Sequence, residues 1–218
     1  MRRSRKTDWM RRLVRENSLS SNDFILPIFV TEGKNKKIPI KTMPEVFRYS
    51  VDKLGQIVDR ALKLKIPMVA IFPQTNSGLK DSYGSEALNE NNLVCKAIRK
   101  IKDKYRNEIG IMTDVALDPY TSHGHDGILR NKRILNDETI EILIQQSLLQ
   151  AQMGSDVIAP SDMMDGRIGE IRQELDNNSL KDIKILSYAV KYASSFYGPF
   201  RDAAVSYTHL TLPTIKRV

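Results

Sequence analysis

The chain has one cysteine and no apolar run close to the length that crosses a membrane. A single thiol excludes an intrachain disulfide. The surroundings of Cys95, LVCKAIRKI, are typical of the buried face of a helix, so we interpret this residue as structural. A spanning helix needs about 18 or more apolar residues, and the N-terminus lacks the apolar core of a signal peptide. We therefore expect a cytoplasmic protein without a membrane partner.

Glycine-rich phosphate motifs are also missing. Neither GxGxxG nor GxxxxGK[ST] follows any apolar run, which argues against a nucleotide-binding open sheet. The formal net charge of +8 does not come from a patch of interleaved arginine and aromatic residues. Much of the excess lies in the first dozen residues, so we expect a basic arm over residues 1–23 and no nucleic-acid partner.

What the chain does contain is an alternation of short apolar runs with longer segments of helical period. The runs, each rich in Val, Ile or Phe, are Phe24–Val30, Met68–Phe72, Ile109–Val115, Asp156–Ala159 and Ile183–Ser187. The helical segments are Val51–Lys65, Glu86–Tyr105, Asp137–Met153 and Met164–Glu174. This alternation predicts repeated βα units around a parallel sheet whose strands are buried on both faces.

Residues that begin and end helices support this interpretation. Asn136 or Asp137 can cap the third predicted helix, and Gly154 suits the left-handed turn that ends it. We interpret Asp165, which precedes Gly166, as the cap of the next helix.

Polar residues at the ends of the predicted strands favour a barrel over an open sheet. Asp114 ends the third run, Ser161 and Asp162 follow the fourth, and Lys191 follows the fifth. Converging polar groups at the C-terminal ends of strands are how (β/α)8 barrels build their sites. Such a barrel needs eight strands and about 250 residues, so we expect an incomplete TIM barrel over residues 24–204.

The final segment, VSYTHLTLPTIKRV, shows neither a helical period nor a further βα unit. We interpret residues 205–218 as a non-native tail and leave them out of the fold.

The densest group of chemically active side chains lies in DVALDPYTSHGHDG, residues 114–127. Asp118 and Asp126 offer oxygen ligands, which suit Mg²⁺ better than Zn²⁺. His123 and His125 either support such ligands or bond the backbone of the loop. The alternative to metal or catalytic use is a solvated loop.

A second chemical candidate is Lys191, which stands near Tyr188, Tyr192, Phe196 and Tyr197. A partly desolvated ammonium group deprotonates more readily, and the free amine can attack a carbonyl to form a Schiff base. The alternative is a lysine that reaches solvent from a strand end.

An anchoring role is open to Arg201, because a guanidinium group at the mouth of the barrel suits the carboxylate of a small anionic substrate. The alternative is a local ion pair with Asp202.

Four segments together resemble the porphobilinogen synthase (5-aminolevulinate dehydratase) family, and the resemblance covers residues 2–204. They are WMRRLVREN, DVALDPYTSHGHDG, APSDMMDGRI and SYAVKYASSFYGPFRDAA. The resemblance implies the condensation of two 5-aminolevulinate molecules to porphobilinogen, with loss of two waters, on the path to heme and other tetrapyrroles. Two barrel lysines form the Schiff bases in this family.

The resemblance also assigns roles to individual residues. Lys191 matches the first Schiff-base lysine, and the second has no counterpart here, so we expect this chain alone to be inactive. Asp114 and Ser161 match catalytic polar positions near the reacting amines. The resemblance implies that the substrate pocket contains Arg201, Tyr197 and Asp162, with Arg201 holding a carboxylate.

Cofactor and assembly follow from the resemblance as well. Zinc-using members carry three cysteines where this chain has Ala116, Asp118 and Asp126. This implies a magnesium-type member that binds Mg²⁺, with K⁺ as an additional candidate cation, and no catalytic zinc. The basic arm resembles the extension that wraps a neighbouring subunit, which implies a homo-octamer.

Two other functions remain open on the residues alone. A class I aldolase shares the barrel and the imine-forming lysine but does not need the Asp/His loop. A non-catalytic basic protein would use its arginine-rich arm on nucleic acid and would show strongly salt-dependent binding.

Overall fold

A computed structural model of the chain describes residues 2–191 and 197–204, apart from the side chains of Tyr197 and Arg201. The strands are β1 (Ile25–Thr31), β2 (Lys37–Pro39), β3 (Phe47–Ser50), β4 (Met68–Gln74), β5 (Gly110–Val115), β6 (Ile128–Arg130), β7 (Arg133–Leu135), β8 (Val157–Pro160) and β9 (Lys184–Ile185). The α-helices are α1 (Asp8–Leu13), α2 (Leu54–Lys63), α3 (Leu93–Tyr105), α4 (Asn136–Gln152), α5 (Arg167–Asn177) and α6 (Tyr197–Ala204). Short 3₁₀ turns cover Arg3–Arg5, Ser21–Asp23, Val51–Lys53, Ser77–Leu79 and Ser85–Leu88.

The order of the strands in the main sheet distinguishes a barrel from a doubly wound open sheet. Its order is β2-β3-β1-β4-β5-β8-β9, so the five strands predicted from the apolar runs lie side by side in chain order. All four pairings among them are parallel. A doubly wound sheet reverses its strand order at a switch point, whereas a (β/α)8 barrel does not. The five strands therefore follow the order of a barrel, while β3 lies parallel to β1 on its other side. The sheet ends at β2 and β9 in the described residues.

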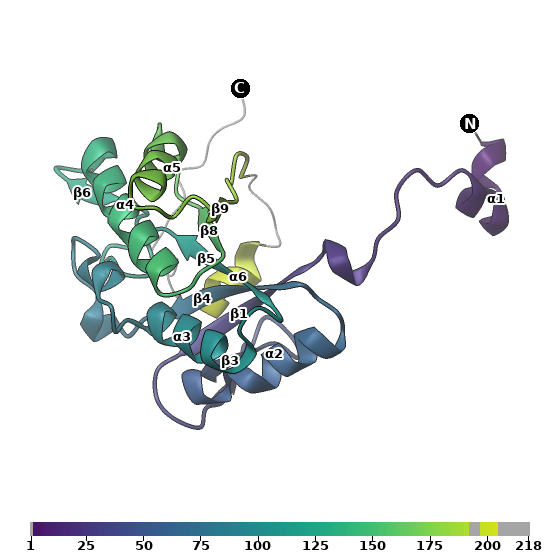
Figure 1. The fold of residues 1–218 in the computed structure, drawn as a ribbon, viewed down its shortest axis with the longest axis horizontal. Coiled ribbons are helices and arrows are strands. Elements are labelled where there is room, and N and C mark those ends of the chain that lie inside the picture. Colours follow the sequence, from purple (N-terminus) through teal and green to yellow (C-terminus); the bar gives the residue numbers. More distant parts are fainter. Residues whose placement is uncertain (1, 192–196, 205–218) are drawn as a thin grey trace.

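Alternation along the strands separates two faces of this sheet. Ile28, Val69 and Ile111 pack with Val58 of α2 and Ile98 of α3, which cover one face (Figure 1). All five side chains are almost fully buried, as expected for strands between a helical layer and the barrel interior.

The other face of the sheet carries α6. Phe200 lies edge-on to Phe29, with ring centroids 5.6 Å apart, and to Phe72, with ring centroids 5.0 Å apart. The Arg48 Nε atom of β3 donates a hydrogen bond of 2.8 Å to the Ala203 carbonyl. These contacts hold the last described helix on the face opposite to α2 and α3.

Two helix-capping predictions were wrong, and one was confirmed. Leu135 is the N-cap of α4 without a side-chain bond, because the Asn136 amide instead exchanges two hydrogen bonds with the backbone of Asp165. Asp165 does not cap α5, whose N-cap is Gly166 in the left-handed region at φ 84°. Gly154 adopts the expected left-handed conformation at φ 110°.

Two antiparallel pairs were not predicted from the apolar runs. β2 pairs with β3 at the edge of the sheet, and β6 pairs with β7 in the segment that leads into α4. Both pairs consist of three- or four-residue strands, too short for a period to show.

The N-terminal segment has no buried residue from position 2 to position 23, and it extends away from the sheet (Figure 1). The domain boundaries, including the interpretation of residues 205–218, stay predictions, and that tail lies outside the described residues. Cys95 is buried within α3, as expected. Among the described residues, no helix is long and apolar enough to cross a membrane.

Candidate active site

The cluster of polar residues is built by the adjacent ends of β5 and β8. Asp114 is opposite Ala159, and Val115 is opposite Pro160. The Ser161 N–H continues the ladder by donating to the Val115 carbonyl over 3.1 Å. This register brings Asp114 of one strand and Ser161 after the other to the same edge of the sheet, as predicted for a barrel mouth.

Lys191 joins this edge from the segment that follows β9. Its Nζ atom donates to the Ser161 carbonyl oxygen and lies 3.9 Å from Oδ2 of Asp126. Its side chain is 24% exposed. Aromatic residues were predicted around Lys191, but the side chains of Tyr192, Phe196 and Tyr197 lie outside the described residues. The contacts that the structure shows for the Lys191 ammonium group are with oxygen atoms of Ser161 and Asp126.

The Asp114 carboxyl group has the most perturbed proton affinity in the cluster. Its Oδ1 atom is buried without a hydrogen-bond partner among the described residues. Burial raises the pKa of Asp114 to about 7; the Ser161 hydroxyl and the Lys191 ammonium oppose this shift, whereas the carboxylates of Asp126 and Asp162 add to it. A group that titrates near neutral pH beside an amine can both donate and accept a proton.

The carboxylate of Asp162 is held by a backbone N–H group and by an arginine. This buried carboxylate accepts a 2.7 Å hydrogen bond from the Met164 N–H, and Nε of Arg167 lies 2.9 Å from Oδ2. Burial raises the pKa of Asp162 to about 6, against the effects of the Met164 N–H and Arg167. These contacts brace the loop between β8 and α5. The substrate-binding role of Asp162 stays a prediction.

The two aspartates of the loop over residues 116–127 lie beside different lysines. Asp118 is only 2% exposed, and its charge partly offsets the lowering of the Lys80 pKa by burial. Asp126 instead faces Lys191 and has a buried Oδ1 atom without a hydrogen-bond partner among the described residues. In the described part of the chain, no three His, Cys, Asp or Glu side chains are grouped to hold a metal ion.

The ring of His123 bonds backbone groups, which was one of the two alternatives for the histidines of this loop. Nδ1 of His123 accepts a 3.2 Å hydrogen bond from the His125 N–H. Nε2 of His123 lies 3.3 Å from the Ser82 carbonyl oxygen. Burial lowers the pKa of His123, so the neutral ring is favoured in this turn.

Several residues of the site were missed from the sequence. They are Lys80 opposite Asp118, Arg167 opposite Asp162, and the buried glutamines Gln146 and Gln150 of α4. Only the glutamines left a signal, because they stand four residues apart at positions where an apolar helix face was expected. The side chains of Tyr197 and Arg201 lie outside the described residues, so their roles stay predictions.

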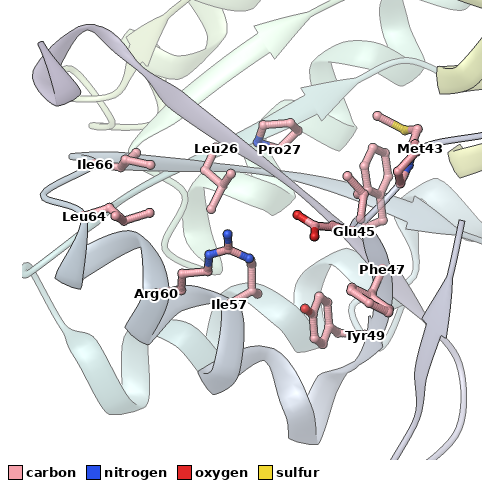
Figure 2. A pocket seen from close by; sticks show the side chains of 13 residues that line it. Leu26, Pro27, Met43, Glu45, Phe47, Tyr49, Ile57, Arg60, Leu64 and Ile66 are labelled. Atoms are coloured by element: carbon pink, nitrogen blue, oxygen red, sulfur yellow. The ribbon is translucent and has the colours of Figure 1, made fainter.

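A separate cavity of about 310 Å³ lies between α2 and the first half of β1. Figure 2 shows its mainly apolar walls, including Leu26 and Ile57, and the side chains of Glu45 and Arg60 that approach each other there. None of its lining residues belongs to the cluster of Asp114, Ser161 and Lys191. This cavity is therefore distinct from the strand-end site.

Comparison with known proteins agrees with the architecture. The family model "Delta-aminolevulinic acid dehydratase" matches residues 1–212. The delta-aminolevulinic acid dehydratase of Bradyrhizobium diazoefficiens is 55% identical over 210 residues, which are 96% of this chain and 59% of that protein. The enzyme of the same name from Chlamydia pneumoniae is 47% identical over 206 residues, 94% of this chain and 62% of that protein.

A solved structure shows the same fold. The crystal structure of delta-aminolevulinic acid dehydratase (porphobilinogen synthase) from Toxoplasma gondii ME49, in complex with the reaction product porphobilinogen, superposes with a TM-score of 0.87. It is 40% identical in sequence, and the match covers 98% of this chain and 60% of that one. This chain thus spans about three fifths of the lengths of these relatives. By sequence and by fold, the chain belongs to the delta-aminolevulinic acid dehydratase family.

Proposed function

We propose that this chain carries the first imine-forming site of a porphobilinogen synthase that acts on 5-aminolevulinate. The observation that supports this most directly is the meeting of Lys191 with Asp126, Ser161 and Asp114 at the ends of β5 and β8. Membership of the family supports the choice of substrate.

The proposed chemistry starts with the free amine of Lys191, which attacks the ketone carbon and forms a C–N bond. In two steps the nitrogen loses two protons and the former carbonyl oxygen gains two; the C–O bond breaks, the oxygen leaves as water, and the imine remains. Asp114 suits the proton transfers because its pKa of about 7 allows both forms at neutral pH. Arg201 is proposed to hold the substrate carboxylate, and Tyr197 and Asp162 to line the pocket.

Borohydride trapping tests this proposal without requiring the second half of the reaction. The chain is incubated with 5-aminolevulinate, reduced, digested and analysed by peptide mass spectrometry. We expect one reduced adduct, on Lys191, because proton-transfer groups lie beside this amine and speed its reaction with the ketone. Lys102, which pairs with Asp156 over 2.8 Å, serves as an internal control. A folded chain with no adduct, or with label spread evenly over its lysines, would contradict the proposal.

Formation of porphobilinogen needs more than the imine at Lys191. The sequence contains a counterpart for one of the two Schiff-base lysines, and the prediction that this chain alone forms no porphobilinogen remains to be tested with a colorimetric assay of the product. The trapping experiment is independent of that result, because it needs only Lys191.

We also propose Mg²⁺, with K⁺ as an additional candidate, and no catalytic zinc. Mg²⁺ is commonly held by one or two carboxylates and several waters, and the buried, unpartnered Oδ1 atom of Asp126 fits the role of a first ligand. Asp118 fits less well, because it is only 2% exposed, whereas the Asp126 side chain is 15% exposed and leaves more room for the waters of a bound ion. The loop has no thiolate that would favour zinc.

Thermal melts test the metal assignment. We expect millimolar Mg²⁺ to raise the melting temperature by roughly 2 to 4 °C, the shift that about 1 kcal/mol produces in a chain of this size. Asp126→Asn should abolish this rise, whereas Asp118→Asn should leave most of it. Stabilisation by micromolar Zn²⁺, or an Mg²⁺ effect that survives in Asp126→Asn, would rule the assignment out.

Assembly and location complete the proposal. The exposed basic segment over residues 2–23, with Trp9 58% and Leu13 74% exposed, supports an octamer in which this arm covers a neighbouring subunit, and light scattering would measure the mass. The expected cytoplasmic location stays a prediction that cell fractionation can test.

A further inference from the structure

Helix α4 buries polar side chains where a helix usually buries apolar ones. Thr139, Gln146, Ser147 and Gln150 are each 0% exposed. Burying a side-chain amide costs free energy unless both of its ends are hydrogen-bonded. The Oε1 atoms of Gln146 and Gln150 are buried without a hydrogen-bond partner among the described residues. An apolar side chain of similar volume would avoid this cost, so stability alone does not explain the two glutamines.

Their amide groups do have a specific target, which is the backbone at the end of β5. Nε2 of Gln150 donates to the Asp114 carbonyl over 3.1 Å, and Nε2 of Gln146 donates to the Ala116 carbonyl over 3.3 Å. Four residues of helix rise about 6 Å, and two residues of strand advance about 6.6 Å. The spacing of Gln146 and Gln150 along α4 therefore matches the spacing of the Ala116 and Asp114 carbonyls at the end of β5, so both hydrogen bonds can form at once.

The end of β5 needs these bonds because its backbone there pairs with β8 but no longer with β4. The carbonyls of Ile111 and Val115 accept from the backbone of Asp156 and Ser161 on the β8 side. Successive carbonyls along a strand alternate in direction, so the Asp114 carbonyl faces the β4 side. Pairing of β5 with β4 ends at Thr113. The glutamine amides thus replace ladder bonds that β4 no longer supplies.

We propose that Gln146 and Gln150 are positioning residues, which fix the end of β5 and thereby hold the Asp114 carboxyl group beside Ser161 and Lys191. Because Oδ1 of Asp114 has no partner among the described residues, the Ser161 hydroxyl and the backbone of β5 together hold the carboxyl group in place. Gln146 extends the same support to Ala116, where the loop bearing Asp118 and Asp126 begins. The catalytic consequence rests on the proposed function of Lys191, whereas the structural consequence does not.

Gln150→Met and Gln146→Met test the proposal, singly and together, because Met keeps most of the volume and removes the donor. Ser147→Ala is the matched control. It removes a buried hydroxyl between the two glutamines, whose hydrogen bond among the described residues stays within the helix, to the Leu143 carbonyl over 2.7 Å.

The first readout is hydrogen–deuterium exchange of peptides that cover residues 110–121. We expect at least tenfold faster exchange there in each glutamine variant and less than twofold change in Ser147→Ala. The second readout is the rate of borohydride-trapped adduct at Lys191 with 5-aminolevulinate. This rate at saturation should fall at least tenfold, with an unchanged half-saturation concentration, because neither glutamine touches the substrate.

A purely structural role would lower the amount of trapped adduct in proportion to unfolded chain and leave the rate of the folded fraction unchanged. That result, or equal exchange in the Ser147→Ala control, would overturn the proposal. If the double variant does not fold, the two single variants decide between the same outcomes. If the wild-type chain forms no Lys191 adduct, the proposed function fails, and the exchange readout alone decides whether the glutamines position β5.

Discussion

Lys191→Met is expected to abolish the borohydride-trapped adduct, by at least a hundredfold relative to the unmodified chain. The thioether keeps the reach of the side chain but has no nitrogen, so no C–N bond to the ketone can form. Peptide mass spectrometry after reduction measures the loss.

A matched control is available on the same part of the chain. Lys184 of β9 is exposed, and Lys184→Met should leave the trapped adduct unchanged. Lys191→Met also removes the cation that lies 3.9 Å from Asp126, so its fold should be checked by circular dichroism. Persistence of the adduct in Lys191→Met, on any other lysine at the wild-type rate, would show that the imine forms elsewhere.

Asp114→Asn is expected to stabilise the fold at pH 8 much more than at pH 5, and to slow imine formation. Burial raises the pKa of Asp114 from the ordinary value of 3.8 to about 7. Below pH 3.8 the carboxyl group is neutral in both the folded and the unfolded chain, so its burial carries no ionisation penalty. As the pH rises toward 7, only the unfolded chain ionises freely, and folding stability falls.

The size of this effect can be estimated from the same shift. About two pKa units lie between pH 5 and the folded-state value, at about 1.4 kcal/mol each, so the wild type should lose about 3 kcal/mol at Asp114 over that interval. An amide does not ionise, and Asp114→Asn should therefore gain roughly 5 to 10 °C more in melting temperature at pH 8 than at pH 5.

Asp162→Asn tests the same rule at a second buried carboxyl group. Burial also raises the pKa of Asp162, to about 6, so its melting temperature relative to wild type should also rise from pH 5 to pH 8, but by less than in Asp114→Asn. Loss of the charge beside Arg167 should lower the melting temperature at both pH values. If Asp114→Asn shows the same difference from wild type at both pH values, the Asp114 carboxyl group does not carry the expected shift. If it forms the imine at the wild-type rate, Asp114 is not the proton-transfer group.

The sequence by itself determined the parts of the fold that depend on local period and composition. The apolar runs at residues 24–30, 68–72, 109–115, 156–159 and 183–187 became β1, β4, β5, β8 and β9. Doubly buried strands are continuous in apolar residues, and their helices have a 3.6-residue period, so both can be recognised without knowing their neighbours. Since parallel strands present their C-terminal ends at one edge, Asp114, Ser161 and Lys191 could also be predicted to converge.

The tertiary structure alone decided which partner each polar side chain meets. Asn136 bonds Asp165, which is 29 residues away, instead of capping its own helix. Asp118 and Asp126 share one short loop, yet they face Lys80, which precedes the loop in the sequence, and Lys191, which follows it. Gln150 supports the strand that ends at Val115 because pairing with β4 stops at Thr113. Such contacts depend on strand register and on where each ladder ends, and these are set by packing between distant segments, which local sequence does not encode.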